Sequence, residues 1–323
     1  MERADGERGG AVLTVGIDIG GTKIAGGVVD EHGAVLARVR VATPGGIGEI
    51  DAAIVQMVGE LRAEHEVAAV GIAAAGFIDR DRSKIYFGVN IPWRNDQMRP
   101  RLEQRLGLPL TIENDANAAG WAEYRFGAGR GFAHVVMLTI GTGVGGAVVV
   151  GGRLYRGGHG VAGELGHTRH IRDGLPCGCG QRGCIEQYAS GRALQRIANE
   201  IADAGGIGVG LAAARTERGR LSGQTISELV RQNDPGAREA VRTVASALGE
   251  SCAQLTASLD PEVFVLGGGV AQLGEHLRAP VEDSYRTHLP ARGFRPAAAI
   301  AIAELHNDAG LIGAADLARQ VRP

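Results

Sequence analysis

Four side chains suited to metal binding are gathered near the middle of the chain. Cys177, Cys179 and Cys184 form a C-x-C-x4-C cluster, and His167 precedes it by a few residues. Three thiolates and one imidazole match the ligand set of tetrahedral zinc. Because four protein ligands leave no open position for water, we predict a structural zinc ion that holds the surrounding loop in shape.

Other uses of these residues remain open at this point. A disulfide would leave one thiol of the cluster unpaired, and buried free cysteines are the third possibility. His159 and His170 are alternative histidine ligands. Two carboxylates, Glu164 and Glu186, lie beside the cluster. We expect a metal-fixed loop to present them, together with His167, to a bound ligand.

A short motif near the N-terminus is suited to binding phosphate. Asp18 ends an apolar, β-branched run, and Gly20, Gly21, Thr22 and Lys23 follow before a second apolar run. These runs predict hairpin-linked strands, without the helix that a Walker phosphate loop requires. The backbone N–H groups and hydroxyl of such a turn can hold a phosphate, and Asp18 is placed to hold Mg2+ through water. An ordinary β-turn with an exposed lysine is the alternative.

The pattern of strand, glycine–threonine turn and strand occurs a second time. Residues 134–140 form an apolar run that ends at Gly141, Thr142 and Gly143, and another apolar run follows. A lone glycine-rich turn is weak evidence for nucleotide binding. Two such hairpins in one chain instead suggest a duplicated α/β domain that holds phosphates from both halves.

A third glycine turn follows a further buried run, residues 263–266. Gly267, Gly268 and Gly269 stand at its end. Glycines at this place let the flat base or ribose of a nucleotide lie against the backbone. A plain strand-to-helix turn is the alternative.

An acidic residue stands where a strand gives way to a helix. The strand of residues 110–112 leads into Asn114 and Asp115, and helical spacing continues over residues 116–124. A carboxylate in this place can accept a proton from a substrate hydroxyl, but Asp is also a common N-cap residue. On position alone, the capping role is the stronger interpretation.

Two stretches carry weaker signals. Asn90 and Asn95 lie in an irregular stretch where their amides can bond sugar hydroxyls or simply cap the loop. Trp93, between them, is a candidate for the wall of a pocket. Residues 204–223 are rich in glycine and arginine, which predicts a mobile surface segment.

Composition and charge limit the class of protein. The chain has 323 residues, 44% of them apolar and 22% charged, with a net charge of -2. This is the profile of a globular protein with no electrostatic case for nucleic acid or an anionic membrane. No apolar run reaches the ~20 residues that span a bilayer. Residues 1–10 are polar and contain no apolar signal core, which predicts a short disordered tail on a cytoplasmic protein.

Several longer motifs together resemble one protein family. The stretches DIGGTK, ENDANAAGWAE, LTIGTGVGGA, GELGH and CGCGQRGCIE are similar to those of the ROK family of sugar kinases. The resemblance covers residues 12–317 and is most pronounced toward bacterial glucokinases, on the stretches IPWRN and AEYRFGA. It implies an actin-like or hexokinase-like ATPase fold, with two lobes, a duplicated α/β core and a cleft between them.

The resemblance also implies roles for individual residues. Asp115 corresponds to the catalytic base of the family, which raises that role above capping. His167 would serve zinc and sugar, one ring nitrogen for each. The residues that would contact the sugar are Asn90, Asn114, Asp115, Glu164, His167 and Glu186. The residues that would bind ATP and Mg2+ are Asp18, Gly20, Gly21, Thr22, Lys23, Thr142, Gly143, Gly267, Gly268 and Gly269.

The function implied is an ATP-dependent hexose kinase that phosphorylates the 6-hydroxyl of glucose, with Mg2+ and a structural Zn2+. The alternatives are another hexose (fructose, mannose, N-acetylmannosamine or allose), polyphosphate as donor, or a non-catalytic sugar sensor. Repressors of the family carry a helix-turn-helix segment before the first phosphate motif, and about a dozen residues stand there in this chain, too few for that domain. The family also implies a homodimer or homotetramer without a nucleic-acid or membrane partner.

The same resemblance also implies domain boundaries. We expect residues 11–125 to form an N-terminal α/β lobe, closed by a C-terminal helix over residues 308–320. Residues 126–307 then form a C-terminal α/β lobe that carries the zinc loop, residues 167–184.

Overall fold

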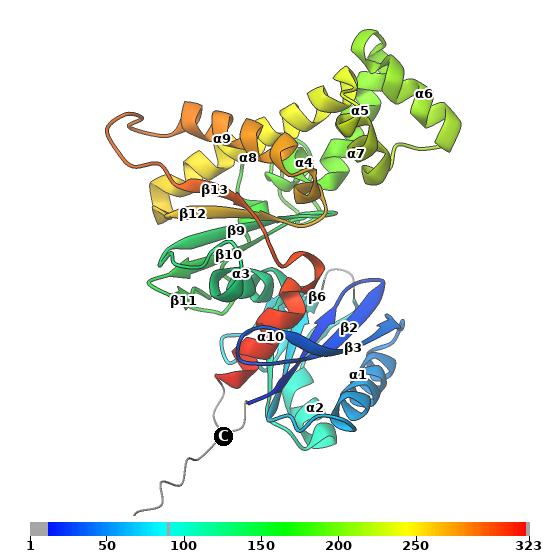
Figure 1. Cartoon of the computed structure of the whole chain (residues 1–323), viewed down its shortest axis with the longest axis vertical. Helices are drawn as coiled ribbons and strands as arrows, with labels where there is room; N and C mark the ends of the chain where they lie inside the picture. Colours follow the sequence, from blue (N-terminus) through cyan, green and yellow to red (C-terminus); the bar gives the residue numbers. More distant parts are fainter. Residues whose placement is uncertain (1–11, 89–90, 321–323) are drawn as a thin grey trace, which may run out of the picture. The chain divides into compact units, whose positions relative to one another are not determined.

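The computed structural model describes residues 12–88 and 91–320 (Figure 1). The tail expected over residues 1–10 and the candidate sugar ligand Asn90 therefore lie outside the described residues. The chain divides into two compact units. The first unit consists of Met1–Ala122, Gly158–Val161 and Asp308–Pro323, and the second of Glu123–Gly157 and Ala162–Asn307.

The first unit is built on a five-stranded sheet in the order β3-β2-β1-β4-β8. Its strands are β1 (Thr14–Ile19), β2 (Lys23–Val29), β3 (Val35–Ala42), β4 (Ala69–Ala74) and β8 (Leu110–Asn114). The first three strands pair antiparallel as consecutive hairpins, while β4 and β8 run parallel to β1. The predicted hairpin-linked strands are thus confirmed.

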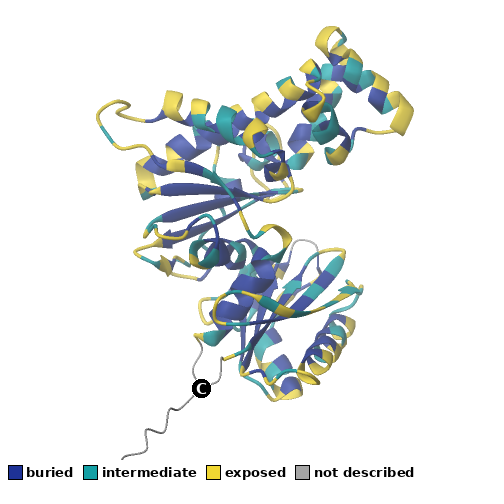
Figure 2. Ribbon diagram, in the orientation of Figure 1, coloured by how far each residue is buried: buried dark blue, intermediate teal, exposed yellow. Residues whose placement is uncertain are grey.

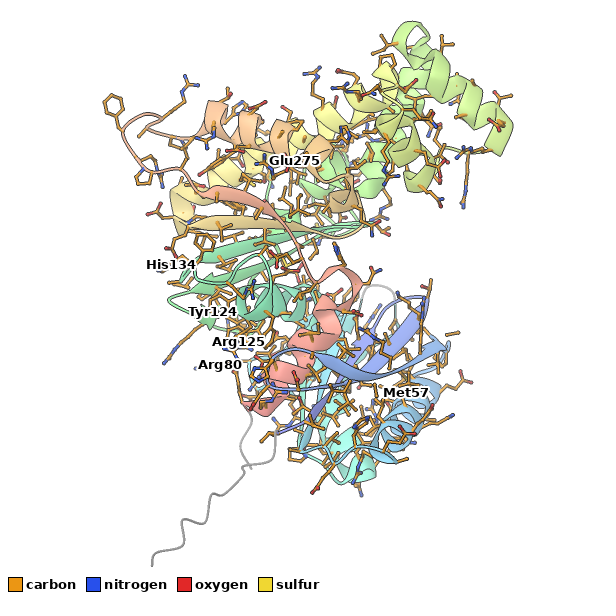
Figure 3. The ribbon with its side chains drawn as sticks, in the orientation of Figure 1. Met57, Arg80, Tyr124, Arg125, His134 and Glu275 are labelled. Atoms are coloured by element: carbon orange, nitrogen blue, oxygen red, sulfur yellow. The ribbon has the colours of Figure 1, made fainter. Side chains whose placement is uncertain are left out.

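Helices cover this sheet, and a small sheet adds to the unit. The helices are α1 (Ile47–Arg62), α2 (Met98–Leu106), α3 (Asp115–Phe126) and α10 (Ala309–Arg319). The small sheet contains β5 (Gly76–Ile78), β6 (Ile85–Gly88) and β7 (Arg94–Asp96). Apolar residues of α1 at helical spacing face the core, and Met57 (Figure 3) reaches the sheet at Gly26.

The C-terminal helix α10 packs against β1 and β4 of the first unit. Side chains larger than hydrogen at Gly16 and Gly71 would overlap with the backbone carbonyls of Leu311 and Ala314, so these glycines permit the close approach. The indole N–H of Trp121 also donates to the carboxylate of Asp316 at 2.8 Å. Helix α10 is therefore an integral part of the first unit.

The second unit repeats this plan. Its strands are β9 (Val135–Ile140), β10 (Val144–Val150), β11 (Arg153–Leu154), β12 (Val263–Gly267) and β13 (Ala299–Ile302). They are ordered β11-β10-β9-β12-β13, with antiparallel hairpins first and parallel strands after them. The central strands of both sheets are buried, whereas the edge strand β3 alternates between intermediate and exposed residues (Figure 2). The predicted duplication of an α/β domain is confirmed.

The helices of the second unit lie mostly between β11 and β12 in the sequence. They are α4 (Glu186–Ala189), α5 (Gly191–Ala204), α6 (Val209–Arg218), α7 (Gly223–Arg231), α8 (Pro235–Leu259) and α9 (Glu275–His288). Helix α8 begins where Asp234 accepts the backbone N–H of Ala237 at 2.8 Å and Pro235 occupies the first helical position. No helix among the described residues is long and apolar enough to cross a membrane.

Two expectations about local structure are wrong. The segment 204–223, predicted to be mobile, contains α6, because Leu211 and Ala214 are buried where α6 packs against α5 and α8. Most residues of α6 are Ala, Leu, Arg or Glu, which are strong helix formers, so the glycines around them do not prevent the helix. Trp93 has no exposed surface and belongs to the apolar core of the first unit, so it forms no pocket wall there.

Candidate active site

Two carboxylates lie at one edge of the first sheet. Because β1 and β8 both run parallel to β4, their carboxyl ends meet at the same edge, and Asp18 and Asp115 are delivered there. Burial raises the pKa of Asp18 to about 7, and the negative charge of Asp115 adds to this rise, while Lys23 opposes it. A pair of like charges held in a partly buried place is typical of a site that binds a cation or moves a proton.

Asp115 does not cap helix α3. The side-chain oxygen of Asn114 accepts the backbone N–H of Asn117 at 3.0 Å, so Asn114 takes the N-cap position. The amide nitrogen of Asn114 also donates to the carbonyl of Gly76 at 3.2 Å. The capping interpretation of Asp115 is therefore wrong. Burial raises the pKa of Asp115, and the N–H of Ala116 partly offsets the rise.

The base of the first predicted phosphate turn is held by two hydrogen bonds, one within its hairpin and one from the residue after β3. The N–H of Gly20 donates to the carbonyl of Lys23 at 3.0 Å, and the hydroxyl of Thr43 donates to the carbonyl of Gly20 at 2.7 Å. Gly21 and Thr22 are exposed at the tip of the turn. This arrangement leaves the tip accessible to a ligand while its base is fixed.

The second and third glycine turns meet in the second unit. Strand β12 pairs in parallel with β9, which sets Gly267 opposite Thr139. Gly268 has a φ of +84°, and a Cβ there would lie 2.6 Å from the carbonyl oxygen of Ile140. The fold thus places the turn that contains Thr142 and the turn that contains Gly269 side by side.

The four predicted metal ligands converge. One ligand atom from each of His167, Cys177, Cys179 and Cys184 lies within 4.8 Å of every other, which selects His167 over His159 and His170 among the described residues. The sulfur atoms of Cys179 and Cys184 are 3.6 Å apart, too far for a disulfide bond of ~2.05 Å. Tetrahedral zinc with Zn–S bonds of ~2.3 Å would place two sulfurs about 3.8 Å apart. The donor set therefore fits zinc, and the disulfide alternative is wrong.

The two nitrogens of the His167 ring face different partners. Nδ1 lies 3.7 Å from the sulfur of Cys177, close to the separation of about 3.6 Å expected for two zinc ligands of these types. Nε2 lies 3.9 Å from a carboxylate oxygen of Glu164. A zinc-bound Nδ1 would leave Nε2–H as a donor on the side of Glu164. The zinc role of His167 fits this geometry, and its sugar role stays a prediction.

Metal binding also changes the protonation of the cluster. Burial raises the pKa of the Cys184 thiol to about 12, and the neighbouring thiols of Cys179 and Cys177 add to the rise. Thiolates are the form that binds zinc. A zinc ion would therefore supply the positive charge that lets Cys184 ionise near neutral pH.

Glu186, predicted to contact sugar, also contacts the second phosphate turn. One carboxylate oxygen, Oε2, accepts the backbone N–H of Val144 at 3.1 Å. The other, Oε1, lies 4.0 Å from the sulfur of Cys177. A side chain at Gly143 would overlap with this carboxylate, which explains the glycine. Sequence reasoning missed these contacts because the residues are far apart in the chain.

Arg192 is a further residue that the sequence did not single out. Its Nε donates to the carbonyl of Thr142 at 3.0 Å, so a cation lies at the second phosphate turn. Arg192 lies in the first turn of α5. Ser190 is the N-cap of this helix, and its hydroxyl accepts the N–H of Ala193 at 3.2 Å. Ser-Gly-Arg is a helix start, and nothing in that local pattern signals a contact with a turn about 50 residues earlier.

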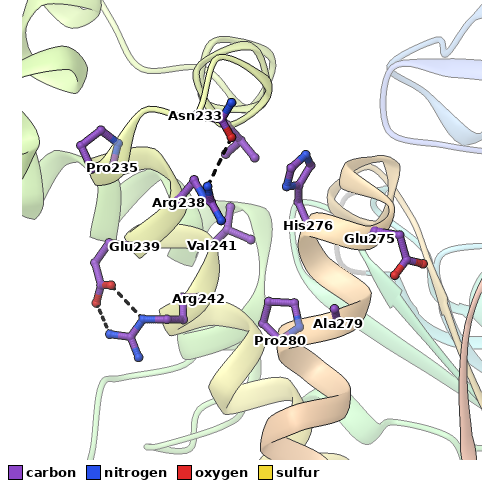
Figure 4. A pocket seen from close by; sticks show the side chains of 11 residues that line it. Asn233, Pro235, Arg238, Glu239, Val241, Arg242, Glu275, His276, Ala279 and Pro280 are labelled. Atoms are coloured by element: carbon purple, nitrogen blue, oxygen red, sulfur yellow. Dashed lines mark hydrogen bonds and ion pairs between the residues drawn. The ribbon is translucent and has the colours of Figure 1, made fainter.

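A cavity of about 490 Å³ lies elsewhere in the second unit, by α8 and α9 (Figure 4). Arg242 and Glu239 in its lining bind each other, and Arg238 donates to Asn233 at 3.3 Å. None of the predicted site residues lines it. Glu275 of the lining pairs with Arg278 outside it, so both carboxylates of the cavity are already engaged and we do not place the chemistry there.

Fold and site together define a class. Two α/β sheets of the same topology, each with a ligand turn after its first strand, are the hexokinase-like ATPase fold. The chain belongs to the ROK family, whose model matches residues 14–321.

Individual relatives extend over nearly the whole chain. It is 47% identical over 313 residues to a glucokinase from Streptomyces coelicolor, covering 96% of this chain and 99% of the relative. A crystal structure of a ROK family glucokinase from Streptomyces griseus, in complex with glucose and AMPPNP, matches with a TM-score of 0.87 and 47% identity, over 96% of this chain and 100% of that chain. A ROK hexokinase from Thermus thermophilus matches with a TM-score of 0.79 and 37% identity, over 95% and 98% of the two chains.

Proposed function

We propose that this protein is an ATP-dependent glucokinase, which transfers the γ-phosphoryl group of ATP to the 6-hydroxyl of glucose with Asp115 as general base. One observation carries the chemistry. Asp115 is free of the capping role and stands beside Asp18 at the carboxyl edge of the first sheet. The near full-length likeness to glucokinases, one of them solved with glucose and AMPPNP, supports the choice of substrates.

The role of Asp115 follows from its protonation. An ionised carboxylate within reach of the 6-hydroxyl accepts its proton as the oxygen attacks the γ-phosphorus in line. Burial raises the pKa of Asp115, which brings its basicity closer to that needed near neutral pH. The proton leaves with the carboxyl group, and ADP is the leaving group. Asp115 thus prepares the nucleophile without forming a covalent bond to the substrate.

The remaining assignments concern binding. Asp18 would hold Mg2+ through water, and this ion, when bound, supplies positive charge to the phosphate oxygens. The turn from Gly20 to Lys23 and the turn at Thr142 and Gly143 bind phosphates, and Gly267 to Gly269 lie against the adenosine. The residues that we assign to the sugar are Asn90, Asn114, Asp115, Glu164, His167 and Glu186.

His167, Cys177, Cys179 and Cys184 would hold a structural zinc ion. The metal would hold the His167 ring with Nε2 on the side of Glu164, because the imidazole cannot turn while Nδ1 is bound. We further propose a homodimer or homotetramer that acts in the cytoplasm. Light scattering on the zinc-loaded protein measures the first of these, and a monomeric mass would contradict it.

A coupled ADP-release assay with ATP, Mg2+ and a panel of hexoses tests the proposed activity. Selective turnover of glucose is the expected result. Preference for fructose, mannose, N-acetylmannosamine or allose would keep the mechanism and change the substrate. Turnover only with polyphosphate would change the donor, and no turnover with any pair from zinc-loaded, folded protein would overturn the proposal in favour of a sugar sensor.

A further inference from the structure

A negative charge lies directly against the turn to which we assign phosphate binding. The carboxylate of Glu186 accepts the N–H of Val144, and a side chain at Gly143 would overlap with it. The Glu186 side chain is only 13% exposed, so water screens its charge poorly. A carboxylate in this place repels the phosphates of a nucleotide unless a cation compensates for it.

Arg192 supplies that cation. Its Nη2 lies 3.5 Å from Oε1 of Glu186, and its Nε donates to the carbonyl of Thr142 at 3.0 Å. The guanidinium therefore touches the carboxylate and the turn at the same time. Among the described residues, Arg192 is the cation that forms an ion pair with Glu186.

The helix that carries Arg192 is itself docked on the turn. The N–H of Gly191 donates to the carbonyl of Gly141 at 2.8 Å, and a Cβ at Gly191 would lie 3.5 Å from Val270, next to the third glycine turn. The N-terminal end of α5 therefore adds the positive end of its dipole to the same place. The backbone contact holds Arg192 in register with Thr142.

The guanidinium also keeps capacity for a ligand. A guanidinium has five N–H groups. One donates to Thr142 and one points toward Glu186, which leaves three (5 - 2) without a described protein partner. The Arg192 side chain is 64% exposed, so these groups are accessible.

We propose that Arg192 is a nucleotide-positioning residue, which neutralises Glu186 and fixes Thr142 so that the second turn accepts the phosphates of ATP. This inference rests on the proposed function, because it takes a nucleoside triphosphate as the ligand of the turn. It concerns binding and not the proton transfer. Its effect is therefore expected in the dissociation constant for the nucleotide and in the KM for ATP, with little change in kcat.

A charge cycle tests the proposal. The dissociation constant of AMP-PNP with Mg2+ is measured by calorimetry, without sugar, for wild type, R192A, R192K, E186Q and E186Q/R192A. R192A is expected to bind about tenfold more weakly or worse, the size of effect of one charge-assisted contact. R192K, which keeps the charge, is expected to lose no more than about threefold. Removing the carboxylate as well, in E186Q/R192A, should restore most of the affinity.

The outcomes separate charge compensation from mere support of the turn. Unchanged affinity in R192A would overturn the inference. Equal weakness of R192A, R192K and E186Q/R192A would also overturn it, because only the hydrogen bond to Thr142 would then matter. R242A is the matched control, since Arg242 is 67% exposed and pairs with Glu239 three residues earlier on α8. It should bind the nucleotide as wild type does.

The AMP-PNP binding measurements still test the role of Arg192 if the protein phosphorylates no sugar. Wild-type protein that binds AMP-PNP but phosphorylates no sugar would contradict the proposed function alone, and the variants would still test Arg192. Wild-type protein that binds no nucleotide would overturn both. Melting temperatures of the variants, compared with wild type, show whether any weak binder is simply unfolded.

Discussion

The turn after β1 and the turn after β9 occupy the same place in two sheets of the same topology, yet they carry different chemistry. The first reads DIGGTKI and the second TIGTGV. Asp18 and Lys23 bring both signs of charge to the first turn, whereas the uncharged Thr139 and Gly143 stand in the comparable places of the second. The first hairpin also encloses one residue more, because Ile19 pairs with Ile24 while Ile140 pairs with Val144.

From this difference we expect the two units to contribute differently to the reaction. The first unit keeps the titratable groups, Asp18 and Asp115, on strands and at a helix start, where the backbone fixes them. The second unit has a neutral turn and receives its charges from Glu186 and Arg192. Both come from the sequence inserted between β11 and β12, next to the zinc cluster. Chemistry is thus expected to depend on the first unit, and nucleotide affinity on the second.

The largest effect is expected in the first unit. D115N removes the proton acceptor while keeping the size of the side chain, so kcat should fall by ~10²–10⁴. The affinity for AMP-PNP should stay within about twofold of wild type, because the triphosphate is not the group that Asp115 touches. Steady-state kinetics and calorimetry measure the two quantities. A kcat near that of wild type would show that Asp115 is not the base.

The pH dependence of the wild-type enzyme sharpens this prediction. A general base must be ionised, and burial raises the pKa of Asp115. The rate should therefore fall as the pH is lowered through that raised pKa, at a pH above the ordinary Asp value of ~3.9. A profile of kcat against pH measures it. An acid limb at or below pH ~4 would contradict the assigned environment.

The next largest effect is expected on the zinc content and thermal stability of the second unit. C184S removes a ligand that is 1% exposed, so the zinc content should fall and the melting temperature should drop by roughly 5–10 °C. Metal analysis and thermal unfolding measure these changes. C252A is the control, because Cys252 is buried in the core on α8 and lies outside the metal cluster; it should keep its zinc. Full zinc content in C184S would refute the ligand assignment.

A smaller effect is expected from crowding the second turn. G143A introduces a methyl group that overlaps with the Glu186 carboxylate, so either the turn or the carboxylate must move. We expect the KM for ATP to rise about tenfold, with kcat changed much less, in contrast to D115N. G59A on α1 is the matched control, since no atom lies within 4 Å of an added Cβ there. Equal KM values for G143A and wild type would indicate a freely adaptable turn.

The smallest effect is on stability, again in the first unit. Because burial and Asp115 raise the pKa of Asp18 from 3.8 to about 7, the folded protein binds more protons than the unfolded chain between these values. Stability therefore falls as the pH rises from ~4 to ~7 and then levels off. D18N removes this cost, so without ligands its melting temperature at pH 8 should exceed that of wild type by at least ~2 °C. The difference should vanish near pH 4. A melting temperature of D18N below that of wild type at pH 8 would contradict the raised pKa of Asp18.

Much of this organisation could be predicted from residue patterns. The hairpins, α1 and α2 follow from local apolar spacing, and the metal cluster follows from the spacing of three cysteines and one histidine. The N-cap role of Asn114 is harder to predict, because Asn114 and Asp115 are adjacent and either residue type can cap a helix. Only the bond from Asn117 to Asn114 decides between them.

The rest depends on packing between distant segments. Helix α6 lies between glycine-rich flanks that resemble a loop, and α5 and α8 bury two of its side chains. Trp93 is taken into the core, although its flanking residues resemble a loop. The contact of Glu186 with Val144 joins residues that no local pattern connects, and so does that of Arg192 with Thr142.

One pair of measurements tests the division of work most directly: kcat and the AMP-PNP dissociation constant, determined side by side for D115N and G143A. We expect opposite effects in the two variants. D115N should lose at least ~10²-fold in kcat and bind nucleotide normally, whereas G143A should bind about tenfold more weakly and keep most of its kcat. Two variants that lose both quantities in parallel, or the reverse assignment, would contradict the claim that chemistry lies in the first unit and nucleotide affinity in the second.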